Sequence, residues 1–379
     1  MADSFYEATT TIFSPAIQAW KESGKKIVGY TCSYVPAEIF YAVGILPVRI
    51  RGIETEGMDI GDAYFGPFIC SFPKCILQLA GKGKYRFLDG TIITPGCDAM
   101  RRLDECWRKA GEDYQDIVPP FFYYFDVPHK TMPHGMKWFR EEIQALITEV
   151  EKHFQVTVGD EALRRAIALY NRGRQMLREL EELRTRPEIT ITGSEAFAVA
   201  VAGTVMPRDV YTEKLGRLLE SLKTKPPVSA GKKRILIIGS ISDDIEIVEL
   251  IEKNPDALVV AENLCFGVRY EGNLVAETGD PVTALAESYL GECTCPRMFG
   301  KYKDRLAILK EKIAAAAIDG VIMQNIRFCD LHGSEHGLLE RDLEKAGVPC
   351  LKLEREYGPL TDTGRMQMRI QAFLERISK

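Results

Sequence analysis

The sequence lacks the features that identify several common protein classes. No apolar run reaches the roughly 18 residues that a membrane-spanning helix needs, so we expect no membrane span. No P-loop and no G-x-S-x-G elbow is present, which argues against ATP hydrolysis by this chain and against a serine nucleophile. The turn after residues 234–239 lacks the spaced glycines of a dinucleotide site. Basic residues are not in excess, since the net charge is −5, and this gives no reason to expect nucleic acid as a partner.

Residues 1–4 (MADS) show no signal peptide, which predicts a cytoplasmic protein. The ten cysteines therefore need an explanation, because a reducing cytosol disfavours structural disulfides. Cys106, on a charged helix, and Cys350, in an apolar strand, are interpreted as packing residues. A zinc ribbon would need CxxC pairs, whereas the one close pair, Cys293 and Cys295, is a CxC. Another kind of metal or redox site is the stronger interpretation of the remaining thiols.

Strand and helix patterns alternate in both halves of the chain, which predicts parallel sheets. The expected fold class is α/β, with two Rossmann/flavodoxin-like parallel-sheet domains joined by a helical region. A single N-terminal helix is predicted over residues 5–23. The predicted boundaries are 1–24 for the N-terminal helix, 25–133 for the first α/β domain, 134–230 for the helical region and linker, and 231–379 for the second α/β domain.

Four cysteines come shortly after predicted strands: Cys32, Cys97, Cys265 and Cys329. In open α/β sheets the crevice outside the carboxyl ends of the strands binds ligands, so these thiols should meet between the two halves. Iron-sulfur clusters accept thiolates from any part of a fold. The set that suits such a cluster is Cys32, Cys70, Cys97, Cys265, Cys293, Cys295 and Cys329.

Five segments together resemble the 2-hydroxyacyl-CoA dehydratase and benzoyl-CoA reductase superfamily of iron-sulfur proteins. They are YTCSYVPAEIFYAVGILPVRI (30–50), ICSFPKC (69–75), KYRFLDGTIITPGCDAMRR (84–102), IDGVIMQNIRFCD (318–330) and GRMQMRIQAF (364–373). The resemblance implies one [4Fe-4S] cubane per subunit, held by Cys70, Cys97 and Cys329. The other thiols, Cys32, Cys265, Cys293 and Cys295, match the double-cubane branch, whose [8Fe-9S] cluster needs six thiolates. One of Cys293 and Cys295 is then a bystander, and Cys75 is a neighbour of the site.

The resemblance also implies partners and a reaction. A separate ATP-hydrolysing iron-sulfur activator would deliver low-potential electrons, and this chain, as a homodimer, would reduce a small molecule. The alternative is a subunit of a 2-hydroxyacyl-CoA dehydratase with a single [4Fe-4S] cluster. A cluster protein without catalytic activity is a third hypothesis.

Charged residues near these cysteines have two interpretations each. Glu38 is a candidate acid or base beside the cluster, or a first-turn carboxylate favoured by the helix dipole. His332 and Glu335 are candidates for proton delivery or contacts around the cluster, or have capping and surface roles. Three arginines could offset cluster charge or meet an anionic substrate, or could lie on solvated surfaces: Arg101, Arg102 and Arg269.

Overall fold

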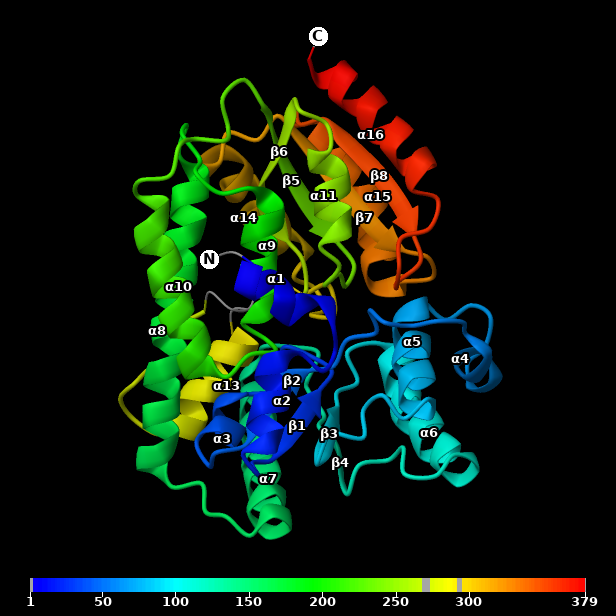
Figure 1. Cartoon of the computed structure of the whole chain (residues 1–379), viewed down its shortest axis with the longest axis vertical. Coiled ribbons are helices and arrows are strands. Elements are labelled where there is room, and N and C mark those ends of the chain that lie inside the picture. The colour runs from blue at the N-terminus through cyan, green and yellow to red at the C-terminus, as the bar shows by residue number, and fades with distance from the viewer. Residues whose placement is uncertain (1–2, 268–272, 292–294, 379) are drawn as a thin grey trace.

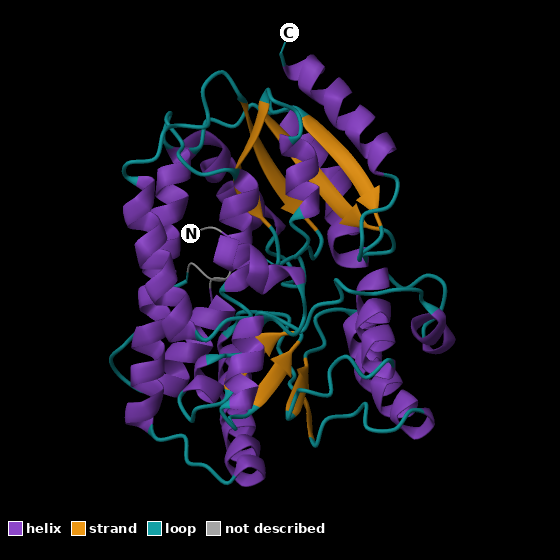
Figure 2. Ribbon diagram, in the orientation of Figure 1, coloured by secondary structure: helices purple, strands orange, loops and turns teal. Residues whose placement is uncertain are grey.

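The computed structural model describes residues 3–267, 273–291 and 295–378. Each half of the molecule contains a four-stranded, all-parallel sheet, and the two sheets lie at opposite ends of the long axis (Figures 1 and 2). The predicted α/β fold with two parallel-sheet domains is confirmed. Among the described residues, no helix is both long and apolar enough to cross a bilayer.

The N-terminal sheet consists of β1 (Ile27–Tyr30), β2 (Leu46–Arg49), β3 (Gly90–Ile93) and β4 (Phe121–Tyr124). Its strand order is β2-β1-β3-β4. Pro47 of β2 pairs with Val28 of β1. Strand β2 tolerates a proline because it lies at the edge of the sheet. Every residue of β1, β2 and β3 is buried, as expected for parallel strands covered on both faces.

The C-terminal sheet consists of β5 (Lys233–Gly239), β6 (Ala257–Asn263), β7 (Gly320–Ile326) and β8 (Cys350–Arg355). Its order, β6-β5-β7-β8, repeats that of the first sheet. Both sheets follow the flavodoxin-like order. In this order the second strand lies on one side of the first strand, and the third and fourth strands lie on its other side. The ligand crevices of this topology therefore lie after β1 and β3 in one half, and after β5 and β7 in the other.

The helices of the first half are α1 (Asp3–Thr10), α2 (Pro15–Glu22), α3 (Glu38–Tyr41), α4 (Asp59–Tyr64), α5 (Ser71–Gly81) and α6 (Asp98–Asp113). The prediction of one helix over residues 5–23 is wrong, because the chain breaks into α1 and α2. Ser14 has an extended conformation before Pro15. Proline starts a helix easily but disfavours helical geometry in the residue before it.

The connecting region contains α7 (Pro133–Phe154), α8 (Asp160–Thr185), α9 (Gly193–Ala202) and α10 (Arg208–Leu222). The second half adds α11 (Glu246–Glu252), α13 (Pro281–Gly291), α14 (Tyr302–Ala315), α15 (Asp330–Glu344) and α16 (Thr363–Ile377). Two helices pack across the predicted boundaries: α9 contacts β6 and α11 of the second half, and α13 contacts α7 and α8. The domain boundaries themselves stay a prediction, but the two halves share packing (Figure 1).

Candidate functional site

Three of the predicted ligand cysteines occupy the same position in three helices. Cys70, Cys97 and Cys329 are the N-cap residues of α5, α6 and α15. A helix N-terminus presents unpaired N–H groups and a partial positive charge, and both favour a thiolate. Each of these sulfurs is therefore held where negative charge is stabilised.

These three thiols also influence one another. Burial raises the pKa of Cys70 well above its ordinary value, and the nearby Cys329 and Cys97 raise it further. Burial likewise raises the pKa of Cys97 to about 12, while the backbone N–H of Met100 acts to lower it. Such thiols are protonated in the metal-free chain, so a metal must displace their protons when it binds.

A second group of thiols comes from both halves. Cys32 follows β1 and Cys265 follows β6. The pKa of Cys32 is raised to about 12, mainly by burial and also by Cys265 and Cys295, while Arg49 acts in the opposite direction. Cys32, Cys265 and Cys295 therefore lie close enough to interact.

Cys295 connects the two groups, because it also raises the pKa values of Cys97 and Cys329. Six predicted ligand thiols thus gather in one region, three from each half: Cys32, Cys70, Cys97, Cys265, Cys295 and Cys329. None of the described cysteines forms a disulfide bond. Cys293 lies outside the described residues, so the choice between Cys293 and Cys295 stays a prediction.

The turn after β5 positions Cys329. Burial raises the pKa of Cys329, and the hydroxyl of Ser240 acts in the opposite direction. The same hydroxyl donates to Oδ1 of Asn325 at 2.7 Å. Gly239, just before it, has φ of 134°, and a Cβ there would lie 1.8 Å from the carbonyl oxygen of Gln324. The turn therefore requires glycine at this position.

Arg49, at the end of β2, contacts the second thiol group directly. Its Nη2 donates to the Cys265 sulfur at 2.9 Å, and its Nη1 donates to the Cys265 carbonyl at 2.7 Å. The side chain is buried and lies over the ring of Phe266 at 3.9 Å. No carboxylate in the described part of the chain forms an ion pair with it. Sequence reasoning missed Arg49, although an arginine ending an apolar strand was a usable signal.

The donor set consists of several cysteine thiols from different segments, and this chemistry is compatible with an iron-sulfur cluster. Within the described ranges, no three His, Cys, Asp or Glu side chains are grouped so as to hold one ion. Thiolates of an iron-sulfur cluster bind different iron atoms, so their sulfurs need not converge on one point. A buried guanidinium without a carboxylate needs another negative partner. Thiolates that bind such a cluster would provide that negative charge.

Two further arginines hold the Cys295 segment in place. Arg297 donates to the carbonyl oxygens of Pro95, Val127 and Pro128, the Pro128 bond measuring 2.7 Å. Because Pro95 precedes Cys97 by two residues, Arg297 joins two ligand loops. Its partners are carbonyl groups distant in sequence, so no pattern could identify it.

Arg305 performs a similar task from α14. Its Nη1 donates to the carbonyl of Cys295 at 3.1 Å, and its guanidinium pairs with Glu335 of α15. Glu335 therefore acts on the site through Arg305. The candidate His332 contributes its backbone N–H, which lowers the pKa of Cys329, and its ring lies 6.2 Å from that of His336.

Glu38 is fully buried at the start of α3 and is not a free carboxylate. Its Oε1 accepts from Nη2 of Arg174 at 2.7 Å, and its Oε2 accepts from the hydroxyl of Tyr289 at 2.7 Å. Arg174 also donates to the Tyr289 hydroxyl at 3.1 Å. This geometry suits a carboxylate that positions an arginine and a tyrosine; an acid/base role for Glu38 stays a prediction.

The remaining candidates are three arginines and Cys75. Arg101 and Arg102 are exposed on α6, and Arg102 pairs with Glu105 at 2.7 Å. Arg269 lies outside the described residues. Cys75 is buried, with its sulfur 3.6 Å from the carbonyl oxygen of Tyr357, and its place as a neighbour of the site stays a prediction.

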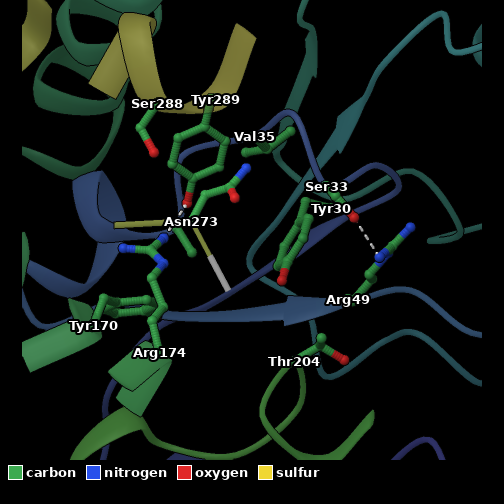
Figure 3. Close-up of a pocket in the computed structure, with 11 residues that line it drawn as sticks. Tyr30, Ser33, Val35, Arg49, Tyr170, Arg174, Thr204, Asn273, Ser288 and Tyr289 are labelled. Carbon is green, nitrogen blue, oxygen red and sulfur yellow. Dashed lines mark hydrogen bonds between the residues drawn. The ribbon is translucent and has the colours of Figure 1, made fainter. Parts of the chain in front are cut away.

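A small pocket adjoins the Cys265 end of the thiol group (Figure 3). Ser33 and Arg49 line one side, where Arg49 donates to the Ser33 hydroxyl at 2.5 Å. Arg174 and Tyr289 lie on the other side. The full lining is Tyr30, Ser33, Val35, Ala37, Arg49, Tyr170, Arg174, Thr204, Asn273, Ser288 and Tyr289.

The opposite end of the thiol group lies beside two exposed aromatic rings. Phe68 and Phe328 are 75% and 42% exposed, and their rings meet edge to face with centroids 5.6 Å apart. They precede Cys70 by two residues and Cys329 by one. The two ends of the thiol group therefore have different surroundings, a polar pocket at one and exposed aromatic rings at the other.

Comparison with known proteins agrees with this arrangement. The family model of the 2-hydroxyglutaryl-CoA dehydratase D-component matches residues 32–377, which include all the cysteines considered above. The chain belongs to this family. The predicted membership of the 2-hydroxyacyl-CoA dehydratase and benzoyl-CoA reductase superfamily is thus confirmed.

Relatives of this dehydratase-family chain are similar over most of their length. The (R)-phenyllactyl-CoA dehydratase beta subunit of Clostridium sporogenes is 26% identical, covering 94% of this chain and 93% of the relative. A benzoyl-CoA reductase subunit from Thauera aromatica is 27% identical, covering 89% and 88%. The (R)-2-hydroxyglutaryl-CoA dehydratase beta subunit of Acidaminococcus fermentans is 24% identical, covering 94% of each. All three are named as subunits of enzymes, and their names include both dehydratases and a reductase.

Proposed function

We propose that this chain is an iron-sulfur reductase of the double-cubane branch. It would receive low-potential electrons from a separate ATP-hydrolysing iron-sulfur activator and transfer them to a small molecule. The observation that carries the proposal is the continuous group of six thiols. A single [4Fe-4S] cluster on Cys70, Cys97 and Cys329 would leave three half-buried thiols, Cys32, Cys265 and Cys295, and the buried Arg49 without a role.

The residues around the thiols have distinct tasks in this proposal. An [8Fe-9S] cluster bound here would store electrons at low potential, and thiolate ligation, burial and hydrogen bonds to sulfur would set that potential. The helix N-termini and Arg49 stabilise the negative charge of the ligands. Arg297 and Arg305 hold the Cys295 segment against both halves.

The proposed activator would deliver electrons at the end of the thiol group marked by Phe68 and Phe328. This end is favoured because the two aromatic rings are exposed and lie next to Cys70 and Cys329 in sequence. A homodimer is part of the proposal, and sedimentation of the cluster-loaded protein tests it. A partner subunit of different sequence, co-purifying in equal amount, would contradict it.

The alternative function is a subunit of a 2-hydroxyacyl-CoA dehydratase with one [4Fe-4S] cluster. The names of two of the three relatives given above favour it. The two proposals differ in the fate of Cys32 and Cys265, which only the double-cubane reductase needs as ligands.

Iron and acid-labile sulfide content of protein purified without oxygen separates the two. We expect about eight iron atoms per chain, and a Cys32→Ser variant should lose about half of them or more. About four in the wild type, unchanged in Cys32→Ser, would support the dehydratase alternative instead. Iron-free protein would contradict both.

Cys75→Ser is the control, because Cys75 is a buried thiol outside the six-thiol group. Its iron content should equal that of the wild type. The same samples, mixed with an activator and ATP, should show reduction of the cluster by electron paramagnetic resonance (EPR).

A further inference from the structure

The pocket of Figure 3 shares a wall with the thiol group. Ser33 and Arg49 line the pocket, and both donate hydrogen bonds to the carbonyl oxygen of Cys265. Arg49 also reaches the Cys265 sulfur. A molecule in the pocket would therefore be separated from a ligand thiol by one side chain.

The size of the pocket limits what can enter it. Its free volume is about 30 Å³. A cavity of about 10 to 15 Å³ on this measure holds one water molecule, so the pocket accepts about two or three heavy atoms. An acyl-CoA thioester is far too large.

The charge of the pocket is positive. Arg174 is neutralised by Glu38. Arg49, which is 4% exposed, has no carboxylate partner in the described part of the chain, and its Nε has no hydrogen-bond acceptor there. A buried donor without an acceptor is unfavourable, and an acceptor atom of a ligand would satisfy it.

The rest of the lining is polar and rich in hydroxyl groups. The hydroxyls of Tyr289 and Thr204 already donate to Glu38 and to the carbonyl of Val201, but the lining also includes the hydroxyl of Ser288 and the amide of Asn273. Such groups can donate to an anion or a small polar molecule. Arg49 favours the anion, because its Nε has no acceptor in the described structure and arginine forms its stronger hydrogen bonds with negatively charged acceptors.

We propose that this pocket binds a small anion of up to about three heavy atoms, held against Arg49 beside Cys265. Arg49 then lies between two negative groups, the ligand thiolate and the anion, and offsets their repulsion. The inference rests on the proposed function in one respect: the bound anion marks where the small substrate of the reductase lies.

The test uses the cluster-loaded protein and a matched pair of ligands. Formate is an anion of three heavy atoms, and formamide is its neutral counterpart of nearly the same shape. Formate should change the EPR signal of the reduced cluster in a saturable way, and formamide should need at least tenfold higher concentration. Equal effects of the two ligands would overturn the choice of an anion.

Two variants on α13 locate the site. Ser288→Phe places a large side chain in the pocket and should weaken the formate effect at least tenfold. Glu287→Phe adds the same side chain at the exposed neighbouring position and should leave the effect unchanged. A formate effect that survives Ser288→Phe would mean that the anion binds elsewhere.

Iron content and activator-driven reduction of the same samples keep this inference separate from the proposed function. Samples with cluster and reduction but without a formate effect contradict only the pocket. If the protein holds no cluster, the anion site is tested with crystals soaked in bromide. Anomalous scattering should then show a bromide ion within hydrogen-bond distance of Arg49. Absence of that peak would overturn the anion site.

Discussion

Individual residues at this site act mainly through charge. Cys32 and Cys97 are neutral thiols in the absence of metal, because burial raises their pKa values. Arg49 carries a permanent charge into the same region. The site therefore carries the positive charge of Arg49 without a balancing thiolate charge until a metal displaces the thiol protons.

Replacing Arg49 should lower the midpoint potential of the cluster. Arg49→Met removes a cation that stabilises the reduced form. Hydrogen bonds to charged groups contribute about 1.5 to 3 kcal/mol, and 1.4 kcal/mol is about 59 mV for one electron, so the potential should fall by about 60 to 130 mV. EPR-monitored redox titration measures it.

Arg49→Lys should retain most of the wild-type potential because it keeps the charge. Arg102→Met is the matched control, since Arg102 lies on α6 near Cys97 but is exposed. A shift in Arg102→Met as large as that in Arg49→Met would show that contact with sulfur is not the cause.

At the scale of elements, α15 combines a ligand thiol with a buried histidine. Cys329 caps its N-terminus, and His336 lies further along the helix with 5% exposure. Burial lowers the pKa of His336 to about 4; Lys352 lowers it further, and Glu340 acts in the opposite direction. In the described structure, its Nε2 has no hydrogen-bond partner.

This histidine should make the protein less stable in weak acid. Unfolded chains protonate histidine near pH 6.5, whereas folded His336 stays neutral down to about pH 4, so the unfolded state binds the extra proton between these values. The free energy of unfolding should fall by roughly 2 kcal/mol from pH 7 to pH 5 on this account. Urea unfolding of iron-free protein measures it without acid release of metal.

His336→Leu should remove most of this pH dependence. His134→Leu, which changes an exposed histidine on α7, should leave it intact. Equal slopes in His336→Leu and the wild type would assign the acid sensitivity to other groups.

The same elements show what the sequence could predict. The strands before Cys32, Cys97, Cys265 and Cys329 were recognisable because buried parallel strands are short apolar runs. The thiols could be placed at strand ends from pattern alone. The break at Pro15 was missed because the apolar periodicity continues across it, although proline was a visible warning.

Contacts between distant segments were beyond sequence reasoning. Arg297 and Arg305 bind carbonyl groups, and every residue has a carbonyl, so no residue pattern identifies the partner. The packing of α13 on the first half follows from the three-dimensional arrangement rather than from local sequence. The pocket depends on the same arrangement, since it lies between α13, α8 and the ends of β1 and β2.

At the scale of the whole molecule, a buried ion pair joins the halves. Nε of Arg51, just after β2, lies 2.5 Å from Oδ2 of Asp243, just after β5, and the two side chains are 2% and 0% exposed. The hydroxyl of Tyr357 donates to the other carboxylate oxygen at 2.7 Å. The carbonyl of Thr9 accepts from Arg51 at 2.8 Å.

Breaking this pair should loosen the contact between the halves. Asp243→Leu leaves Arg51 buried without a partner and should cost about 3 to 5 kcal/mol. The double variant Arg51→Met/Asp243→Leu should recover most of that loss, because it leaves no unpaired charge. Urea unfolding gives the energies, and iron content reports whether the thiol group stays assembled.

The exposed pair Arg217 and Glu213 provides the control. Glu213→Leu should change the free energy of unfolding by less than about 1 kcal/mol. If Asp243→Leu costs no more than Glu213→Leu, the buried pair does not hold the halves together.

The equal division of the thiols between the halves has a consequence for biosynthesis. Cys32 and Cys329 are separated by 297 positions, so a growing chain presents only part of the ligand set for most of its synthesis. The proposed double cluster could be inserted only once both halves have folded and met. Cluster maturation machinery would therefore act on the finished fold, and a misfolded second half would leave the first without its full cofactor.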